Sequence, residues 1–319
     1  MTATLTKATP QRGSLAEAPE FLWTFKAPSG SNRDEGELTH ITIPFRGDSG
    51  RLQGGAIHLE DHARARVFLQ YKPQDPSPGR SYGAMDGETE LFRTSLEIHL
   101  GPYAQLELFV LSSLPATLTR EALDHCTLEE GSRLIWTDVG FDAGKGTYER
   151  NIMFTGKESE LDFAGAYGAV CDTEGTYILT TRHRGPRTKS RVYLKSALKD
   201  SAHLIFKGLI HIEESAAGSD AYLSNRNLVL NDGVRAESLP QLKIETDDVV
   251  CSHGSTTGGP REEELFYLTS RGLDTDSAKS LLVEAHLSAV LDRLPEESRE
   301  EVERRAFDLL GIHEGGACS

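Results

Sequence analysis

Two side chains that could ligate a metal ion stand close together in the segment Val249–Gly258, which reads Val-Val-Cys-Ser-His-Gly-Ser-Thr-Thr-Gly. Its apolar start and its Gly/Ser/Thr end predict a strand that runs into a turn. On a strand, Cys251 and His253 are two residues apart and leave the same face. A thiolate and an imidazole can both ligate borderline and soft metal ions. Two ligands cannot close a tetrahedron, so the sequence predicts half of a metal site.

The same segment has a structural interpretation. Val249 lies on the face that carries Cys251 and His253, so this face could simply point into a core. A buried cysteine there would act as a small hydrophobic residue, and the imidazole would satisfy its nitrogens locally. Spacing alone favours this structural interpretation. The residues His183 and His211, single imidazoles in strand-like contexts, are likewise expected to be structural.

The carboxylates of Asp247 and Asp248 immediately precede the segment. Adjacent residues on an extended chain point to opposite faces, so the two cannot work together as an acid/base pair. At least one of them is expected to point to solvent.

Most of the chain from about residue 41 to residue 258 is predicted to be strand. Residues 65–71, 105–111, 133–139 and 203–212 are rich in β-forming residues, and each run follows a short polar or glycine-containing turn. Several runs share an entry pattern in which a turn leads to a small residue and then to polar/apolar alternation. Repetition of this unit without intervening helices indicates stacked rungs, although a β-sandwich also contains many short strands. The irregular spacing does not choose between the two folds.

After Gly258 the pattern changes to helix. Residues 262–269 predict one short helix, Asp274 or Thr275 can cap a second, and Pro295 with two following glutamates opens a third. The second helix has apolar residues at helical spacing: Ala278, Leu281, Leu282, Ala285, Ala289, Val290 and Leu294. This helical appendage could cap the open end of a stack of rungs, or it could be a docking surface for another protein.

Composition sets the class of protein. The 319 residues suffice for one large domain or two ordinary ones, and 38% of them are hydrophobic. A formal net charge of -15 argues against a nucleic-acid or anionic-membrane partner. No apolar run approaches the roughly 18 residues of a membrane span, and the first residues lack the apolar core of a secretory signal. We therefore expect a cytoplasmic protein.

The four cysteines are widely spaced and include no Cys-x-x-Cys pair, which excludes the common zinc-ribbon and thioredoxin spacings. So few thiols in a chain of this length do not suggest a disulfide framework, and reduced thiols are expected. The C-terminal Cys318, within Gly-Gly-Ala-Cys-Ser, is expected to be incidental.

Several catalytic motifs are missing from the sequence. Residues 140–146 come near a phosphate-binding P-loop, but they are one residue short, and Gly146 stands where the hydroxyl residue is needed. There is no His-Glu-x-x-His motif, and residues 254–258 lack the central serine of a nucleophile elbow. The chain is therefore not expected to hydrolyse ATP itself, and the missing motifs leave a hydrolase open only through scattered carboxylates.

A family resemblance rests on the block from Cys251-Ser-His-Gly to Leu265-Phe-Tyr-Leu. Further matching stretches are Phe206-Lys-Gly-Leu, Asn227-Leu-Val-Leu, Ser238-Leu-Pro-Gln-Leu and Ser270-Arg-Gly-Leu. The chain resembles the SufB/SufD scaffold proteins of iron–sulfur cluster assembly, and its Cys-Ser-His-Gly form looks like SufD. The resemblance is strong over about residues 190–290 and weaker over about 45–190.

The resemblance implies a mainly β fold, a right-handed parallel β-helix over residues 45–258. A short, partly disordered segment (1–44) would precede it, and a helical domain (259–319) would follow. It also implies a non-enzymatic scaffold that pairs with a SufB-like chain, or with itself as a homodimer, and that binds a SufC-like ABC ATPase through residues 260–310. In SufD members a functional histidine stands at the position of His253 and meets a cysteine of SufB across the interface.

The resemblance further implies that a nascent iron–sulfur cluster forms transiently at that interface, with His253 and Cys251 as its candidate ligands in this chain. The resemblance allows for a flavin in the complex, and this chain alone is expected to bind no cofactor tightly. The residues leave open whether a cluster, iron or a flavin contacts this subunit.

Two departures from the SufB pattern favour SufD. In SufB, the rung before this segment carries a cysteine. When that rung is aligned with residues 227–244, Val234 stands at the position of the cysteine. SufB also has Glu-His-Glu where this chain has Cys251-Ser-His253. The alternatives are a secreted-type β-helical carbohydrate-active enzyme and a purely structural β-helix protein. The first needs an export signal that the sequence does not show, and only the family resemblance argues against the second.

Overall fold

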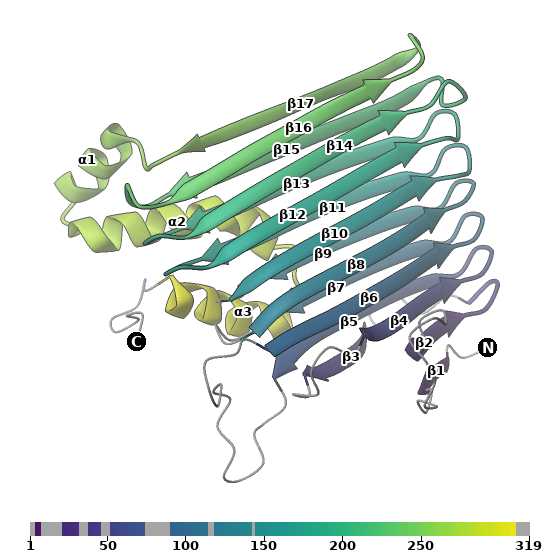
Figure 1. The fold of residues 1–319 in the computed structure, drawn as a ribbon, viewed down its shortest axis with the longest axis horizontal. Helices are drawn as coiled ribbons and strands as arrows, with labels where there is room; N and C mark the ends of the chain where they lie inside the picture. Colours follow the sequence, from purple (N-terminus) through teal and green to yellow (C-terminus); the bar gives the residue numbers. More distant parts are fainter. Residues whose placement is uncertain are drawn as a thin grey trace.

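The computed structural model describes residues 4–7, 21–31, 38–45, 52–73, 90–113, 118–141 and 144–310. Within these ranges, from residue 21 onward, the chain alternates strand by strand between two sheets and so winds into a β-solenoid (Figure 1). Neighbouring strands within each sheet are parallel, apart from the antiparallel pair at the N-terminal end. The mainly β fold and the parallel β-helix are therefore confirmed.

In the part of the chain that the structure describes, the two sheets have nine and eight strands. The nine-stranded sheet contains, in spatial order, β1 (Thr4–Lys7), β2 (Phe21–Ala27), β4 (Leu52–Leu59), β6 (Glu90–Leu100), β8 (Leu118–Leu128), β10 (Lys145–Phe154), β12 (Glu174–His183), β14 (His203–Ile212) and β16 (Arg235–Ile244). The eight-stranded sheet contains β3 (Leu38–Phe45), β5 (Arg64–Pro73), β7 (Gln105–Ser112), β9 (Arg133–Gly140), β11 (Glu160–Ala169), β13 (Lys189–Leu198), β15 (Ser219–Val229) and β17 (Val249–Gly258).

Alternation along each strand builds the core between the sheets. In β14, Leu204, Phe206 and Ile210 are buried, while Lys207 is exposed. The unshifted register repeats this pattern from strand to strand, so that Phe206 lies beside Tyr177 of β12. A parallel ladder keeps aligned side chains on the same face, and the apolar residues therefore stack along the solenoid axis. A run of β-forming residues with apolar side chains at every second position can therefore form a strand of each rung.

One turn of successive rungs has a residue in the same left-handed backbone conformation. Tyr103, Gly131, Glu158, Arg187 and Gly218 occupy successive turns and have positive φ angles of 58°, 62°, 60°, 55° and 75°. Each donates its backbone N–H to a carbonyl of the next turn along the axis, at 2.6–3.0 Å. Three of these turns, at residues 101–105, 130–133 and 157–160, have the entry pattern that indicated repeating rungs, and the bonds stack all five turns in register.

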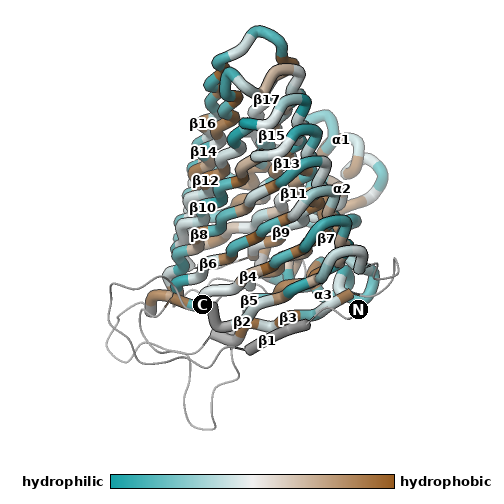
Figure 2. The backbone as a smooth tube through the Cα atoms, turned by 90° about the vertical axis from the view of Figure 1, so that its right-hand side faces the viewer, coloured by the Kyte–Doolittle hydropathy of each residue, from teal (hydrophilic) through white to brown (hydrophobic). Residues whose placement is uncertain are grey.

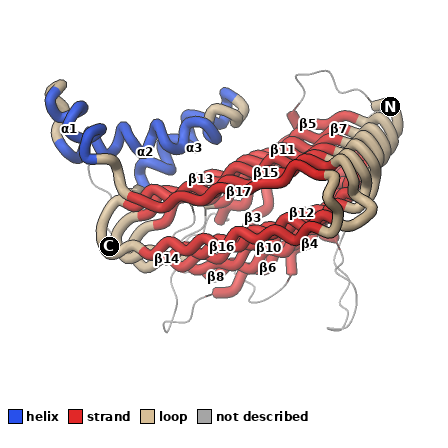
Figure 3. The backbone as a smooth tube through the Cα atoms, turned by 90° about the horizontal axis from the view of Figure 1, so that it is seen from above, coloured by secondary structure: helices blue, strands red, loops and turns tan. Residues whose placement is uncertain are grey.

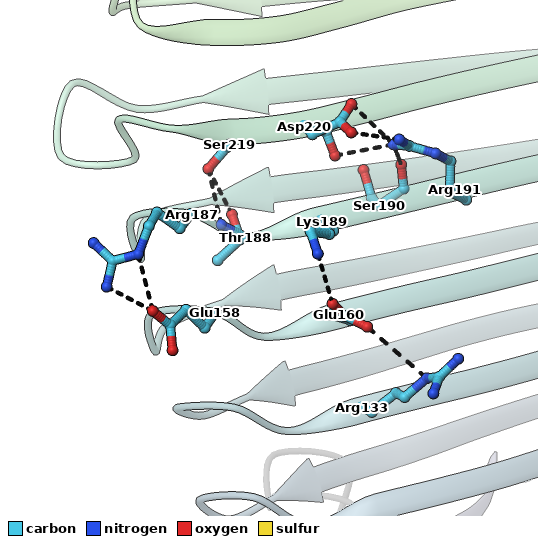
Figure 4. A network of polar contacts seen from close by, with 10 residues as sticks. All are labelled: Arg133, Glu158, Glu160, Arg187, Thr188, Lys189, Ser190, Arg191, Ser219 and Asp220. Carbon is cyan, nitrogen blue, oxygen red and sulfur yellow. Dashed lines mark hydrogen bonds and ion pairs between the residues drawn. The ribbon is translucent and has the colours of Figure 1, made fainter.

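Charged ladders run along the outer face of the eight-stranded sheet and along the turns that lead into it (Figure 4). Glu160 lies 3.1 Å from Lys189 on one side and 3.9 Å from Arg133 on the other, and Glu158 pairs with Arg187. These side chains are largely solvent-exposed, so each pair contributes at most about 1 kcal/mol. The ladders support rung register more than stability.

Three helices follow the solenoid: α1 (Glu262–Ser270), α2 (Thr275–Leu291) and α3 (Glu296–Leu309). Asp274 caps α2 by accepting the N–H of Ser277 at 2.8 Å, and Pro295 precedes α3, both as predicted. The predicted apolar face of α2 is partly wrong, because Leu281, Ala285 and Ala289 are exposed. The buried residues of α2 are Ala278, Val283, Leu287, Val290 and Leu291.

The helices lie along the side of the solenoid and leave its end open (Figure 3). Leu287 and Val290 of α2 and Phe307 of α3 join a hydrophobic cluster with Phe109 and Val139 on the outer face of the eight-stranded sheet. The interpretation of this appendage as an end cap is therefore wrong. The helices pack here because the outer face of the sheet is apolar. Near their C-terminal ends, β7, β9 and β11 bury side chains on both faces.

The sheets begin before residue 45, where sequence analysis placed the start of the β core. The strands β2 and β3 already pair in parallel with β4 and β5, so residues 21–27 and 38–45 belong to the solenoid. Among the described residues, no helix is long and apolar enough to cross a membrane.

The cysteines differ in state. Cys126 is a buried free thiol and Cys251 a half-buried one. Cys171 is disulfide-bonded, contrary to the expectation that all thiols are reduced. Cys318 lies outside the described residues.

Candidate functional site

The terminal rung of the solenoid carries both predicted ligand residues. Strand β17 is the last strand of the eight-stranded sheet, and β16 is the last strand of the nine-stranded sheet (Figures 1 and 2). Among the strands of the described residues, each is paired on one edge only, β17 with β15 and β16 with β14.

Register places the two residues on the lumen side of β17. Cys251 aligns with Ala221 of β15 and His253 aligns with Leu223, both of which are almost completely buried between the sheets. Aligned residues of a parallel pair share a face, so Cys251 and His253 face the lumen at its open end. The prediction that they share one strand face is confirmed.

The two side chains differ in environment. Cys251 is half-buried and packs against the main hydrophobic core, as does Val249. Burial raises the pKa of the Cys251 thiol above its usual value, and the nearby charge of Asp220 adds to the shift. The thiol is therefore protonated at neutral pH and must lose its proton to bind a metal ion. His253, in contrast, is exposed, so the structural interpretation holds for Val249 and Cys251 but not for His253.

The open end exposes a cross-section of the core. Leu242 and Ile244 face the lumen from β16, by their alignment with the buried Ile210 and Ile212, yet they are 38% and 42% exposed. In the inner rungs the corresponding positions are completely covered. An uncovered end of this kind normally requires a capping element or a partner in a repeat protein.

A short ladder of polar side chains joins the last rungs inside the lumen. Ser196 of β13 donates to Asn227 Oδ1 at 2.7 Å, and Asn227 Nδ2 donates to Thr257 Oγ1 of β17 at 3.0 Å. Nearby, Asn225 Nδ2 donates to Ser238 Oγ of β16 at 2.9 Å. These bonds tie both terminal strands to the rung below and hold the strand that carries His253 in place.

The site is incomplete as a metal centre. Over the described ranges, no group of three or more His, Cys, Asp or Glu side chains is arranged to hold a metal ion. Cys251 and His253 can supply two ligands at most, so any cluster bound there needs ligands from a second chain.

The other sequence-derived candidates have structural roles. His183 is fully buried, lies within hydrogen-bond distance of Thr188 Oγ1 (2.7 Å) and Ser190 Oγ (3.1 Å), and stacks on Phe154. Burial lowers its pKa to about 4, so it stays neutral. Nε2 of His211 lies 3.0 Å from Glu245 on the outer face of the solenoid. The acidic pair Asp247 and Asp248 lies in the turn before β17, with both residues exposed.

Comparison with known proteins identifies the family. The sequence profile described as "SUF system FeS cluster assembly, SufBD core domain" matches residues 47–286, three quarters of the chain. The chain belongs to the SufBD family. The match covers both the solenoid and the start of the helical region.

Named relatives of this SufBD protein come from several bacteria. A SufBD family protein of Mycobacterium leprae is 34% identical over 193 residues, which cover 58% of this chain and 46% of that protein. SufD of Escherichia coli is 33% identical over 132 residues, 41% of this chain and 30% of that protein. A SufBD family protein of Synechocystis is 35% identical over 174 residues, 53% and 38% of the two chains. The matched regions span less than half the length of each relative.

Sequence analysis aligned one residue of this SufBD chain with a cysteine of SufB. Val234, predicted to replace the SufB cysteine, lies just before β16, is half-buried and packs against the main core. An aliphatic side chain there cannot carry sulfur. The last rung of this SufBD protein therefore offers Cys251 as its one thiol.

Sequence analysis missed a charged network inside the lumen. Arg150 of β10 lies 2.7 Å from Asp138 of β9 and 3.6 Å from Asp124 of β8, and all three are buried. The hydroxyl of Tyr167 donates to the same oxygen of Asp138 at 2.5 Å. The signal was present in the sequence, because Asp124 shares its strand face with the apolar Ala122, Cys126 and Leu128.

The network shifts the pKa values of its members. Burial raises the pKa of Asp124 to about 6, against the opposing effect of the Arg150 and Arg120 charges. The Asp138 carboxylate raises the pKa of Arg150 above its usual value despite burial, so this guanidinium stays charged. Breaking one partner of such a pair is strongly destabilising, because it leaves an uncompensated buried charge. The network lies several rungs from β17, so we assign it to the scaffold and not to the candidate site.

Proposed function

We propose that this chain is a SufD-like, non-enzymatic scaffold subunit of an iron–sulfur cluster assembly complex. It pairs with a SufB-like scaffold, or with a second copy, through the open end of the solenoid. It binds a SufC-like ABC ATPase through residues 260–310. A nascent cluster is the cargo, and His253 with Cys251 is this chain's contribution to its binding.

The open end is the observation that carries the proposal. A terminal rung with an exposed core cross-section and two free strand edges needs a partner of matching shape, and another β-solenoid supplies one. His253 is exposed at this end, and Cys251 stands beside it on the same face. Pairing at this end would bury both residues and bring ligands from a second chain to a site that lacks them.

The helix α1 supports the ATPase contact. It has no buried residue, and its Phe266 and Tyr267 are 74% and 57% exposed. Leu273 and Leu281 nearby are also partly exposed, at 37% and 43%. Large aromatic side chains left uncovered on one helix are typical of a protein-binding surface. We call Phe266, Tyr267, Leu273 and Leu281 the α1 patch.

The connection between the open end of the solenoid and the α1 patch is short. Strand β17 ends at Gly258, and α1 begins four residues later at Glu262. A force applied to α1 by the ATPase would therefore reach the strand that carries His253 through only three residues. We propose that nucleotide-driven movement of the ATPase acts on the interface by this route.

Reconstitution tests this function. The purified chain is combined with an ABC-type ATPase and a SufB-like scaffold from the same organism, and the complex is isolated before and after incubation with iron, a sulfur donor and ATP. We expect a stable complex that gains iron and acid-labile sulfide. A chain that binds neither protein, or a complex that stays free of cluster, contradicts the proposal.

A further inference from the structure

The disulfide at Cys171 identifies its second cysteine by elimination. The sequence contains four cysteines, Cys126, Cys171, Cys251 and Cys318. Cys126 and Cys251 are free thiols, whereas Cys171 is disulfide-bonded. The remaining cysteine, Cys318, lies outside the described residues. Within a single chain it is therefore the cysteine left to pair with Cys171.

Cys171 lies in the tight turn that joins β11 to β12. Its φ angle is 56°, and Thr173 closes the turn by donating its N–H and its hydroxyl to the carbonyl of Val170, at 3.1 and 2.6 Å. Cys171 is only partly buried, whereas Cys126 is enclosed in the core. A small thiol in solution can therefore reach the turn that carries Cys171 more easily than it can reach Cys126.

The corresponding turn of the next rung fixes the backbone of Cys171. Cys171 donates its N–H to Asp200 Oδ2 at 3.1 Å. Its carbonyl accepts the N–H and the hydroxyl of Ser201, at 2.9 and 2.7 Å. Asp200 in turn donates its N–H to Asn231 Oδ1 at 2.6 Å. The sulfur of Cys171 is thus carried by a backbone that the neighbouring rungs hold in place.

The last helix ends at the same pair of turns. Lys199, two residues before Ser201, donates its Nζ to the carbonyl of Leu310 at 3.3 Å. Leu310 is buried in the hydrophobic cluster between the helices and the outer face of the eight-stranded sheet, and Cys171 packs against this cluster. The residue that follows α3 and the disulfide-bonded cysteine therefore contact one and the same part of the solenoid.

The length of the chain after α3 allows the bond. Cys318 follows Leu310 by eight residues. An extended chain spans at most about 3.3–3.6 Å per residue, so eight residues can bridge roughly 26–29 Å. Leu310 and Cys171 both contact the turn formed by residues 199–201, so the distance to be bridged is well within this reach.

We propose that Cys171 and Cys318 form a redox-sensitive clasp that ties the end of the chain to the solenoid. Disulfides in reducing compartments are usually transient and redox-sensing, and the partly exposed position of Cys171 suits such a bond. The clasp replaces the incidental role that the sequence suggested for Cys318. It concerns residues of this chain alone and does not depend on the proposed function.

The clasp opens and closes by thiol–disulfide exchange. The thiolate of a small thiol such as glutathione attacks one sulfur of the Cys171–Cys318 bond, and a second glutathione resolves the mixed disulfide. The products are two cysteine thiols and one glutathione disulfide, so two electrons and two protons pass to the protein. Closure is the reverse reaction, in which glutathione disulfide takes up the electrons and protons.

The bond closes a loop that contains the strands from β12 to β17 and all three helices. A disulfide restricts the unfolded chain, and the effect increases with the length of the loop. The bond also secures the end of α3, which apolar packing and the contact between Lys199 and Leu310 hold against the sheet. Reduction should therefore lower the melting temperature and loosen α3 more than the solenoid.

Peptide mapping tests the pairing. The protein is equilibrated with glutathione disulfide, unfolded in denaturant, alkylated without reduction, digested and analysed by mass spectrometry. We expect one linked pair of peptides, which carries Cys171 and Cys318. Cys126 and Cys251 should both be alkylated. Absence of the linked pair, a different pairing, or a bond that joins two chains on non-reducing electrophoresis overturns the proposal.

Melting and hydrogen exchange test the clasp itself. Excess dithiothreitol should lower the melting temperature by roughly 5 °C or more and accelerate exchange in residues 296–309 more than in residues 160–169. Cys318→Ser should behave like the reduced wild type and should not respond to dithiothreitol. Cys251→Ser removes a free thiol instead, so this matched control should keep the response of the wild type.

Two results would overturn the clasp even if the disulfide forms. A response to dithiothreitol that persists in Cys318→Ser would assign the effect to another group. Equal exchange of residues 296–309 in the oxidised and the reduced protein would show that the bond does not hold α3. Neither experiment uses the ATPase, a second scaffold or a cluster, so their outcome is independent of the proposed function.

Discussion

Asn227 donates its side-chain amide to Thr257 Oγ1 at 3.0 Å and accepts a hydrogen bond from Ser196 at 2.7 Å. Asn227 is buried inside the solenoid, whereas Thr257 belongs to the terminal strand. The pair therefore anchors the strand that carries His253 to the rung below. With the bond from Asn225 to Ser238, it is one of the side-chain contacts that join the core to the open end.

Removing this anchor should loosen β17. Asn227→Ala leaves two partners unsatisfied and should lower the free energy of unfolding by about 1–3 kcal/mol. Hydrogen exchange of residues 249–258 should accelerate more than exchange elsewhere. Thr257→Val should have a smaller effect of the same kind, and Thr256→Val, on the exposed outer face of the same strand, is the matched control. Equal exchange rates in Asn227→Ala and the wild type would show that the ladder has no anchoring role.

His253→Ala should stop cluster maturation without unfolding the protein. The side chain is exposed, so its removal should change the free energy of unfolding by no more than about 0.5 kcal/mol. Cys251→Ala should reduce cluster yield less, because its thiol is half-buried and protonated at neutral pH. Iron and acid-labile sulfide in the reconstituted complex give the yield, and a thermal melt controls for folding. Normal yield in His253→Ala would remove this residue from the site, and an equal loss of yield and melting temperature would make it structural.

Substitutions in the α1 patch should weaken ATPase binding without destabilising the fold. Phe266→Asp or Tyr267→Asp places a charge on a helix with no buried residue, so ATPase binding should weaken at least tenfold while the melt stays unchanged. Titration calorimetry with the ATPase measures the affinity. Thr275→Asp, at the exposed start of α2, is a control for added charge. Wild-type affinity in both patch variants would place the ATPase contact elsewhere.

Deletion of residues 260–319 is a poor test of the same contact. The strand core is not expected to tolerate such a truncation, because α2 and α3 cover Phe109, Val139 and other apolar residues on the outer face of the eight-stranded sheet. Exposing this surface should lower stability and promote aggregation. A truncated chain that melts like the full-length protein would show that the helices contribute no packing energy.

Asp124 should make stability depend on pH. Its pKa in the folded state, about 6, exceeds the value of 3.8 that applies without burial, so folding favours its protonated form. The resulting stabilisation is fully present below about pH 4 and is lost as the pH rises through about 6. Asp124→Asn stays neutral at every pH, so its stability relative to the wild type should rise by about 1–3 kcal/mol between pH 4 and pH 7.

Urea unfolding at several pH values measures this difference. The control is Asp172→Asn, at an exposed turn position. A constant stability difference between Asp124→Asn and the wild type across this range would show that the carboxyl group is ionised in both states.

Local patterns in the sequence determined the secondary structure of this protein and indicated its family. Alternation of polar and apolar residues identified the strands, Asp274 and Pro295 marked the starts of two helices, and the Cys-Ser-His-Gly block indicated the family that the SufBD core profile confirms. Each of these signals depends on interactions between residues close in sequence, and a short window contains it completely.

The tertiary structure decided what depends on contacts between distant segments. It placed α2 and α3 against the outer face of the eight-stranded sheet instead of over the open end, and it brought Arg150 and Asp138 together inside the lumen. It also left His253 exposed while burying Cys251 halfway, although the two share one strand face. The reason is register: a residue's neighbours in a solenoid come from the rungs above and below, and the last rung has no rung above it.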